Sequence, residues 1–177
     1  DASRYTSRAF HVLEKERMWN RTWQFAVREE DIPKAGDHVL YDIIDKSVIV
    51  MRGDDGVIRG FYNSCLHRGR ALRTQSGCAG QLKCPFHGFT WDLQGRFKSK
   101  PCEWDFQHVD NAKMELPQVR CESWAGFVFI NFDMEAQPLI EYLGVVPDHC
   151  RNYMMDRSHS IAHVQRRLAC NWKVGQE

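Results

Sequence analysis

The sequence predicts a mainly β, antiparallel fold with an N-terminal helix and a C-terminal linker. Two observations lead to this fold class. Short runs of β-branched and aromatic residues, separated by turns rich in Gly and Asp, recur between residues 38 and 132, as consecutive antiparallel strands do. Two short loops interrupt this series, and each carries one Cys and one His. With 177 residues and 43% apolar side chains, the chain can bury a core.

The first predicted element is a helix over residues 6–23. Thr6 or Ser7 can cap its start, because a hydroxyl there accepts a hydrogen bond from a free backbone N–H. Its interior is rich in Glu, Lys and Arg, and three apolar residues share one face at helical spacing: Val12, Trp19 and Trp23. We interpret the tryptophans as packing residues. Residues 31–37 break the pattern and predict a loop.

An antiparallel meander follows, with strands predicted over residues 38–44, 47–52 and 57–62. Further along, the pattern predicts these elements: a strand over 81–84, a hairpin over 89–97, an irregular excursion over 101–116, strands over 118–122 and 126–132, and a short helix with a linker over 138–153. The run from Phe127 to Ile130 is apolar on both alternations, so it predicts a central strand.

The two loops carry the chemistry. The first reads Cys65-Leu66-His67-Arg68-Gly69 and the second Cys84-Pro85-Phe86-His87-Gly88. Together they offer two thiolates and two imidazoles, which is the ligand set of a two-iron, two-sulfur cluster of the Rieske type. Zinc is the alternative, but structural zinc sites usually pair Cys with Cys and His with His. Gly69 and Gly88 follow the histidines, where the backbone must turn tightly.

The four ligands have different expected roles. We expect Cys65 and Cys84 to hold the iron that stays ferric, and His67 and His87 to hold the iron that is reduced, because thiolates donate more charge than neutral imidazoles do. The second nitrogen of each imidazole can face outward. Electron uptake would then be coupled to protonation. Arg68 and Trp91 are candidates for contacts around the ligands, although either could simply be a packing residue.

These motifs resemble the Rieske domain of the large (alpha) subunit of bacterial aromatic ring-hydroxylating oxygenases. The resemblance rests on both loops, on Trp91 and Gly95, and on Asn171-Trp172-Lys173, and it extends along essentially the whole chain. It implies a Rieske-type antiparallel β fold with two cluster-binding loops. It divides the chain into an N-terminal helical segment (1–30), a Rieske 2Fe-2S domain (31–135), and a linker with the start of an α+β catalytic domain (136–177).

The same resemblance implies a role for a longer parent protein. That parent would be a mono- or dioxygenase that takes electrons from NAD(P)H through a reductase, with or without a ferredoxin, and hydroxylates an aromatic or similarly apolar substrate. Its mononuclear Fe(II), held by two histidines and a carboxylate, would lie in the catalytic domain. The Rieske cluster of one subunit would serve the iron of its neighbour in a homotrimer. We expect no catalytic residue within these 177 residues.

A histidine pair near the C-terminus could be mistaken for that second iron site. Asp156, His159 and His163 offer a carboxylate and two imidazoles. In the resembling family, however, four residues separate the two histidines and both follow the Asn-Trp-Lys stretch. Here three residues separate them and both precede Asn171. We therefore predict an extended strand over residues 158–168 that enters the next domain.

Departures from the respiratory Rieske proteins predict a low redox potential. Those proteins carry an extra cysteine in each loop and hydroxyl groups just after the second loop. Here Arg70 and Phe86 stand at the cysteine positions, and Phe89 and Trp91 at the hydroxyl positions. Fewer hydrogen-bond donors stabilise the reduced cluster less. We expect a midpoint near the low end of the Rieske range, about −150 mV.

Basic residues surround the two loops. Seven of them lie between residues 68 and 100, against the single acid Asp92: Arg68, Arg70, Arg73, Lys83, Arg96, Lys98 and Lys100. Such an excess could receive an acidic ferredoxin or reductase, and docking would then weaken with salt. Ordinary solvated surface, or contacts with a neighbouring subunit, is the alternative.

Composition limits the remaining classes. A net charge of +1 gives no argument for nucleic acid or membrane binding, and no apolar run approaches the length that spans a bilayer. Besides the two ligands, five cysteines are expected to be free thiols in a reducing cytoplasm: Cys78, Cys102, Cys121, Cys150 and Cys170. Two alternatives stay open, a stand-alone Rieske ferredoxin-like carrier and a structural zinc domain.

Overall fold

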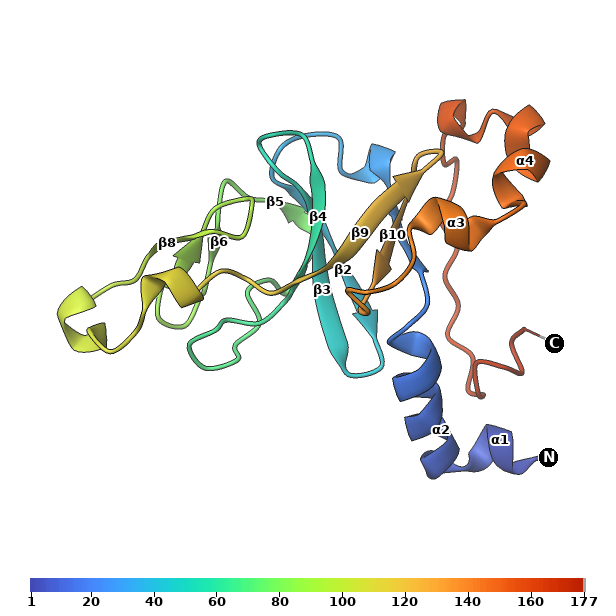
Figure 1. Ribbon diagram of the computed structural model, residues 1–177, viewed down its shortest axis with the longest axis horizontal. Coiled ribbons are helices and arrows are strands. Elements are labelled where there is room, and N and C mark those ends of the chain that lie inside the picture. The colour runs from blue at the N-terminus through green and yellow to red at the C-terminus, as the bar shows by residue number, and fades with distance from the viewer. Residues whose placement is uncertain (177) are drawn as a thin grey trace.

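The computed structural model describes residues 1–176 and has two antiparallel sheets (Figure 1). The larger sheet contains seven strands, which follow one another across the sheet in this order: Gln24–Arg28 (β1), Phe127–Asn131 (β10), Gln118–Trp124 (β9), Ile58–Tyr62 (β4), Lys46–Arg52 (β3), Asp37–Ile43 (β2) and Gly77–Cys78 (β5). The smaller sheet contains Leu82–Lys83 (β6), Thr90–Trp91 (β7) and Phe97–Ser99 (β8). The predicted mainly β class is confirmed.

The predicted meander is present as β2, β3 and β4, which pair as consecutive antiparallel neighbours. Side chains of β3 alternate between the two faces of the sheet, as the period of two requires. Val48 and Val50 pack into one apolar cluster with Val128, whereas Ile49 and Met51 pack into a second cluster that also contains both loop cysteines. The sheet therefore has a core on each face, and the smaller sheet covers one of them.

Strand β1 is a feature that the sequence patterns did not reveal. The helix predicted over residues 6–23 ends earlier, and its helical part consists of three pieces: Ser3–Thr6 (α1), Arg8–Glu14 (α2) and a π-helical turn over Lys15–Trp19 (η1). Ser7 caps α2, because its Oγ accepts a hydrogen bond of 3.3 Å from Phe10 N. β1 then pairs with β10. The interior position predicted for β10 is thereby confirmed, since β1 and β9 flank it.

The remaining helical turns are short. A 3₁₀ turn over Glu29–Asp31 (η2) precedes β2, and two more lie in the excursion at Glu103–Phe106 (η3) and Asn111–Lys113 (η4). After β10 come two short α-helices, Leu139–Leu143 (α3) and Val146–Cys150 (α4), and two 3₁₀ turns, Arg151–Tyr153 (η5) and Met155–Arg157 (η6). The strand predicted over residues 158–168 is wrong, because this segment is irregular. Its backbone is held by side chains instead, with Arg28 donating to Ser158 O.

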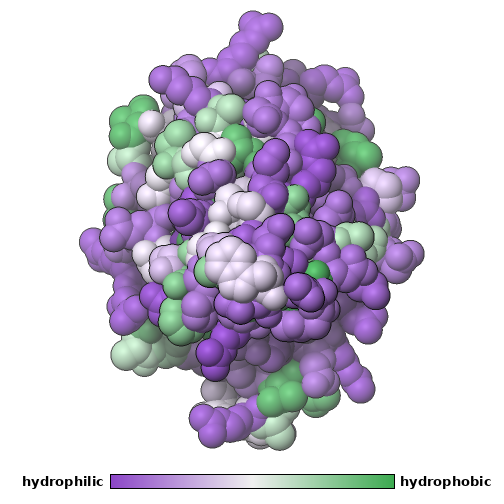
Figure 2. Space-filling view, turned by 90° about the vertical axis from the view of Figure 1, so that its left-hand side faces the viewer, coloured by the Kyte–Doolittle hydropathy of each residue, from purple (hydrophilic) through white to green (hydrophobic). Residues whose placement is uncertain are grey.

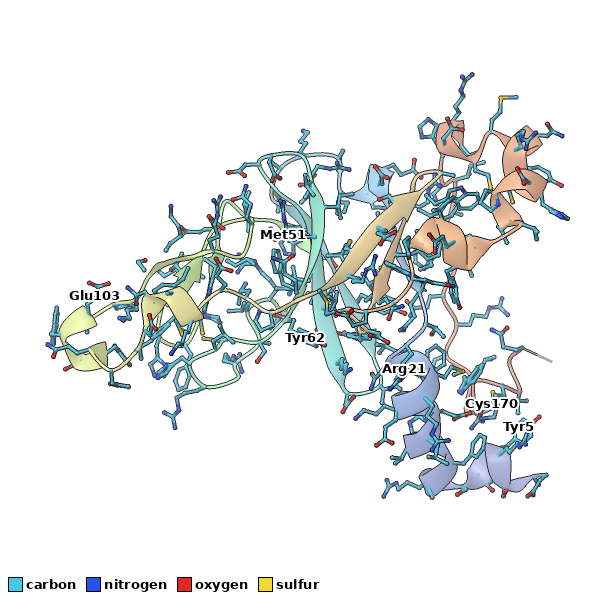
Figure 3. All side chains as sticks on the ribbon, in the orientation of Figure 1. Tyr5, Arg21, Met51, Tyr62, Glu103 and Cys170 are labelled. Carbon is cyan, nitrogen blue, oxygen red and sulfur yellow. The ribbon has the colours of Figure 1, made fainter. Side chains whose placement is uncertain are left out.

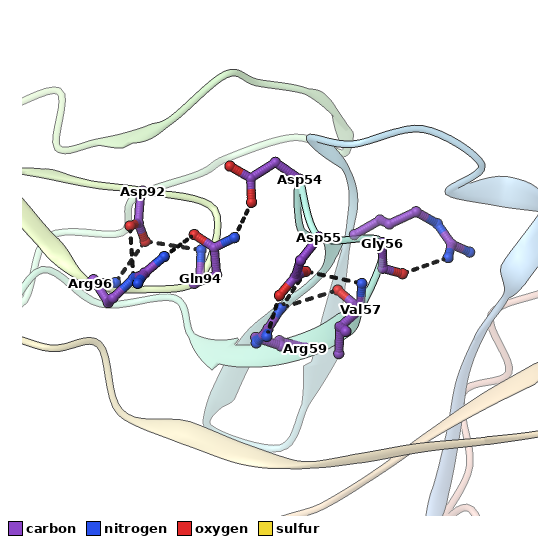
Figure 4. A network of polar contacts seen from close by, with 9 residues as sticks. Asp54, Asp55, Gly56, Val57, Arg59, Asp92, Gln94 and Arg96 are labelled. Atoms are coloured by element: carbon purple, nitrogen blue, oxygen red, sulfur yellow. Dashed lines mark hydrogen bonds and ion pairs between the residues drawn. The ribbon is translucent and has the colours of Figure 1, made fainter.

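A polar network connects the turns of the two sheets (Figure 4). Gln94, in the turn between β7 and β8, donates to Asp54 in the turn between β3 and β4. Gly95 is required in this turn for two reasons. Its φ is +82°, and a Cβ at this position would lie 2.4 Å from Cε1 of Phe61. The smaller sheet is thus fixed closely against the larger one.

The two ends of the chain also meet. Asn171 Nδ2 donates to Tyr5 O at 3.0 Å, and Trp172 packs edge-on against Trp19 with ring centroids 5.1 Å apart. Tyr5 and Cys170 are labelled at this end of the molecule in Figure 3. Within the described residues, no helix has the length and apolar character needed to cross a membrane.

Candidate metal centre

The two ligand loops, residues 65–69 and 84–88, have the same backbone geometry. In the first, Cys65 N donates to Arg70 O and Gly69 N donates to Cys65 O, both at 2.8 Å. In the second, Cys84 N donates to Phe89 O at 2.8 Å and Gly88 N to Cys84 O at 3.0 Å. The glycines that close these turns have φ values of +72° and +73°. The expected tight turns at both glycines are confirmed, and only Gly adopts this conformation without strain.

Both cysteine side chains lie inside the protein. Cys65 and Cys84 are each 2% exposed and belong to the same apolar cluster as Phe89 and Trp91. Burial raises the pKa of the Cys65 thiol, and its contact with Cys84 raises it further. The two sulfurs therefore adjoin each other at the base of the loops, where a positive metal centre would be needed to keep them as thiolates.

The two histidines complete the set of four donors. The rings of His67 and His87 lie 4.8 Å apart, centroid to centroid. The Nδ1 atom of each ring is buried and, within residues 1–176, has no hydrogen-bond partner. Burial lowers the pKa of His67, and the neighbouring His87 lowers it further. Both effects favour the neutral imidazole, which is the form that binds a metal.

This donor set fits a diiron cluster better than a single ion. Buried polar atoms without a partner are costly and uncommon in proteins. Two such nitrogens beside two buried thiols therefore indicate that these four side chains bind a metal cofactor. Residues 1–176 contain no group of three or more His, Cys, Asp or Glu side chains placed to hold one metal ion. A two-iron, two-sulfur cluster needs only two protein ligands at each iron. The residues present therefore fit this cofactor.

Aromatic side chains surround the ligands. Phe89 is fully buried and stacks on His67, with centroids 4.7 Å apart and ring planes 10° from parallel. Trp91 is also fully buried and donates through Nε1 to Met114 O. The hydroxyl of Thr90, between them, donates to Gly88 O at 2.8 Å. Sequence patterns did not single out this hydroxyl, and here it stabilises the loop backbone.

Not all seven basic residues face the solvent. Lys100 is 8% exposed and donates to Val109 O and Asn111 Oδ1, and Arg73 donates to Leu72 O and Gln81 O. Arg96 forms an ion pair with Asp92. Four exposed cations remain without a hydrogen-bond or ion-pair partner within residues 1–176: Arg68, Arg70, Lys83 and Lys98. These four residues thus carry the exposed and unpartnered part of the charge excess predicted around the loops.

The C-terminal histidines do not converge. His159 Nδ1 lies 2.8 Å from Glu30 Oε2, and Ser160 N donates to the other oxygen of Glu30. His163 is exposed. Both histidines line a cavity of about 810 Å³ beside β1 and β2, and none of its lining residues belongs to a ligand loop. Glu30, which pattern reading did not single out, is therefore the partner of His159.

Comparison with known proteins agrees with this geometry. Residues 22–115 match the family model described as the Rieske [2Fe-2S] domain. The chain is 34% identical over 180 residues to the biphenyl 2,3-dioxygenase subunit alpha of Rhodococcus jostii strain RHA1, covering 98% of this chain and 39% of that protein. It is 36% identical over 141 residues to the carnitine monooxygenase oxygenase subunit of Escherichia coli K12, covering 78% of this chain and 37% of that protein.

A solved structure has the same fold. The quaternary ammonium Rieske monooxygenase CntA, in complex with an inhibitor, superposes with a TM-score of 0.91 at 27% identity, covering 98% of this chain and 49% of that one. The chain spans about two fifths of the length of the curated relatives it matches. Its likeness to them is therefore a likeness to their Rieske portion.

Proposed function

Since this chain belongs to the Rieske [2Fe-2S] domain family, we propose that Cys65 and Cys84 hold one iron of the cluster and that His67 and His87 hold the other through Nδ1. The observation that carries this assignment is the pair of buried Nδ1 atoms without partners beside two buried thiols. Coordination would give each nitrogen the partner that it lacks. The opposite ring nitrogens, Nε2, are then the atoms left to exchange protons with the surroundings.

When bound, the cluster takes up and passes on one electron. The protein side chains set the conditions for this transfer. Phe89 and Trp91 are fully buried in the same apolar cluster as Cys65 and Cys84, and they keep water from the two cysteine sulfurs. Neither offers a hydroxyl, so the reduced state receives few hydrogen bonds, and we expect a midpoint near −150 mV, at the low end of the Rieske range of about −150 to +300 mV. Redox titration gives this value directly, and a midpoint above zero would refute the argument.

The parent of this chain, in this proposal, is a terminal oxygenase. Its mononuclear iron would lie in a catalytic domain beyond the linker, and the Rieske unit (31–135) would pass electrons to the iron of a neighbouring subunit in a homotrimer. The relatives named above are a biphenyl dioxygenase and a carnitine monooxygenase, at 34% and 36% identity. We propose an aromatic or similarly apolar substrate for the parent, and a cytoplasmic location.

The electron donor would dock beside the loops. Figure 2 shows this end of the molecule face-on, with a mostly hydrophilic surface. Four exposed cations in this region lack partners within the described residues: Arg68, Arg70, Lys83 and Lys98. Their charge supports an acidic ferredoxin or reductase as the donor. The rate of reduction should then fall as ionic strength rises, and a rate that does not respond to salt would rule out this docking mode.

The cluster assignment is tested by replacing one ligand. Cys84→Ala should abolish the rhombic electron paramagnetic resonance signal of the dithionite-reduced protein, together with its iron and acid-labile sulfide. Cys102→Ala is the matched control, because Cys102 is exposed and lies outside the loops. This variant should keep the paramagnetic resonance signal, the iron and the acid-labile sulfide. A colourless wild-type protein that contains zinc and no sulfide would contradict the proposal and favour a structural zinc domain.

A further inference from the structure

The excursion after β8, residues 101–116, leaves the small sheet and returns over the ligand loops. It forms the left end of the molecule in Figure 1, and Glu103 marks its tip in Figure 3. The excursion begins against the second ligand loop, since Pro101 Cγ lies 3.0 Å from the point where a Cβ at Gly88 would be. Its place beside the loops raises the question of what its side chains do there.

Phe106 brings the excursion to the first ligand loop. Its ring stands perpendicular to the ring of His67, with centroids 5.3 Å apart and planes at 86°. It is also perpendicular to Phe89, at 5.3 Å and 87°. Because Phe89 stacks on His67, the imidazole is enclosed by one ring on its face and a second at right angles. Phe106 itself is half-buried against the apolar cluster that contains the cysteines.

A buried ammonium holds the excursion in place. Lys100 is 8% exposed, and its Nζ donates to Val109 O at 3.1 Å and to Asn111 Oδ1 at 2.7 Å. Val109 N in turn donates to Phe106 O at 3.0 Å. No carboxylate within residues 1–176 forms an ion pair with Lys100. Burial of a charge that has only neutral partners is costly. This cost is consistent with a specific role for Lys100 in fixing the part of the excursion that contains Val109 and Asn111.

We propose that Phe106, held by Lys100, is a positioning residue that shields His67 from water and thereby keeps the midpoint potential of the cluster low. This inference rests on the proposed function, because it requires His67 to be a ligand. Two ferric irons, two sulfides, two thiolates and two neutral imidazoles carry no net charge, and the electron received from the donor makes the set negative. Water stabilises that charge, whereas an aromatic cover excludes water.

The test is a redox titration of cluster-loaded variants, followed by the paramagnetic resonance signal. Phe106→Ala should shift the midpoint to a more positive potential, and Phe106→Met should stay closer to the wild-type value because it keeps an apolar cover and adds no hydrogen-bond donor. Trp104→Ala is the matched control, since Trp104 lies on the same excursion but is 71% exposed; it should not shift the midpoint. Equal midpoints for Phe106→Ala and Trp104→Ala would overturn the inference.

Two further measurements keep the test decisive. Lys100→Met keeps the length of the side chain but loses its donors, so hydrogen exchange should become faster over residues 101–113; unchanged exchange there would overturn the role of Lys100. If Phe106→Ala fails to load the cluster, Phe106→Leu should load it and show a smaller positive shift, and no shift would overturn the inference. A wild-type protein without a cluster would instead refute the proposed function itself.

Discussion

The two ends of this molecule differ in the partners that the protein provides for buried polar groups. At the loop end, the Nδ1 atoms of His67 and His87 are buried without a partner in the described residues. At the terminal end, Oε1 of the buried Glu14 carboxylate accepts a hydrogen bond of 2.5 Å from Lys173 Nζ. Its Oε2 has no hydrogen-bond partner within the described residues, and His11 Nδ1 lies 3.6 Å from it. The comparison teaches that the protein itself supplies a cation for the buried carboxylate at the terminal end, whereas it supplies no partner for the buried imidazole nitrogens at the loop end, where a cofactor fits.

The largest expected effect comes from removing the cofactor. Loss of the cluster leaves two thiols and two imidazoles without ligands, so the loops should open locally. Hydrogen exchange should become faster over residues 65–69, 84–88 and 101–113, and should stay unchanged in α2. Equal changes at both ends of the molecule would break the comparison, because the terminal end contains no cluster ligand.

A single substitution should weaken the terminal end. Lys173→Met leaves the carboxylate of Glu14, which is 8% exposed, without its cation. Breaking a buried ion pair in this way should lower the free energy of unfolding by roughly 3 kcal/mol, as measured by urea titration. The control is Lys113→Met, because the side chain of Lys113 is 84% exposed and its pair with Asp110 lies at the surface; its effect should be below about 1 kcal/mol. Equal losses for the two variants would show that the burial of Glu14 is unimportant.

The effect of pH on this pair should be smaller. Burial raises the pKa of Glu14, but the hydrogen bond and charge of Lys173 outweigh it, so the pKa lies below the ordinary value of 4.5. A carboxyl with a lowered pKa in the folded state contributes stability above its unfolded pKa, and this contribution is lost as the pH falls through the folded value. The stability difference between wild type and Glu14→Gln should therefore be constant near neutral pH and shrink below about pH 4.5.

A difference that persists down to the lowest pH at which the protein stays folded would show that Lys173 does not depend on an ionised Glu14. The paired measurement is thermal unfolding of both proteins over the same acid series. The cluster ligands at the loop end are cysteines and histidines. No carboxylate among them therefore contributes to the stability difference between wild type and Glu14→Gln.

Local patterns predicted much of this architecture, and long-range contacts account for the rest. The meander from β2 to β4 and the two ligand loops were predictable because alternation, turn residues and ligand spacing are all local. β1 was not, since its five residues become a strand through pairing with β10, about a hundred residues later. The burial of the Lys100 side chain was not predictable either, because it depends on Val109 and Asn111, which the excursion brings close to Lys100.

The candidate site shows the same division. Spacing within the loops identified four donors, and both glycines were predicted where the backbone has positive φ. Spacing could not show which imidazole nitrogen faces inward, or that Phe106 would lie against His67. Both depend on how the excursion and the smaller sheet pack. The wrong strand over residues 158–168 has the same origin, because its alternating pattern has no neighbouring strand to pair with among the described residues.

The most direct test of the account is pulsed paramagnetic resonance of the reduced protein labelled with ¹⁵N-histidine. If His67 and His87 ligate the reduced iron, the spectrum should contain strong couplings to two histidine nitrogens, and His163→Gln should leave both in place. Absence of strong histidine coupling in a protein that contains iron and sulfide would contradict the central claim that these two imidazoles hold the cluster.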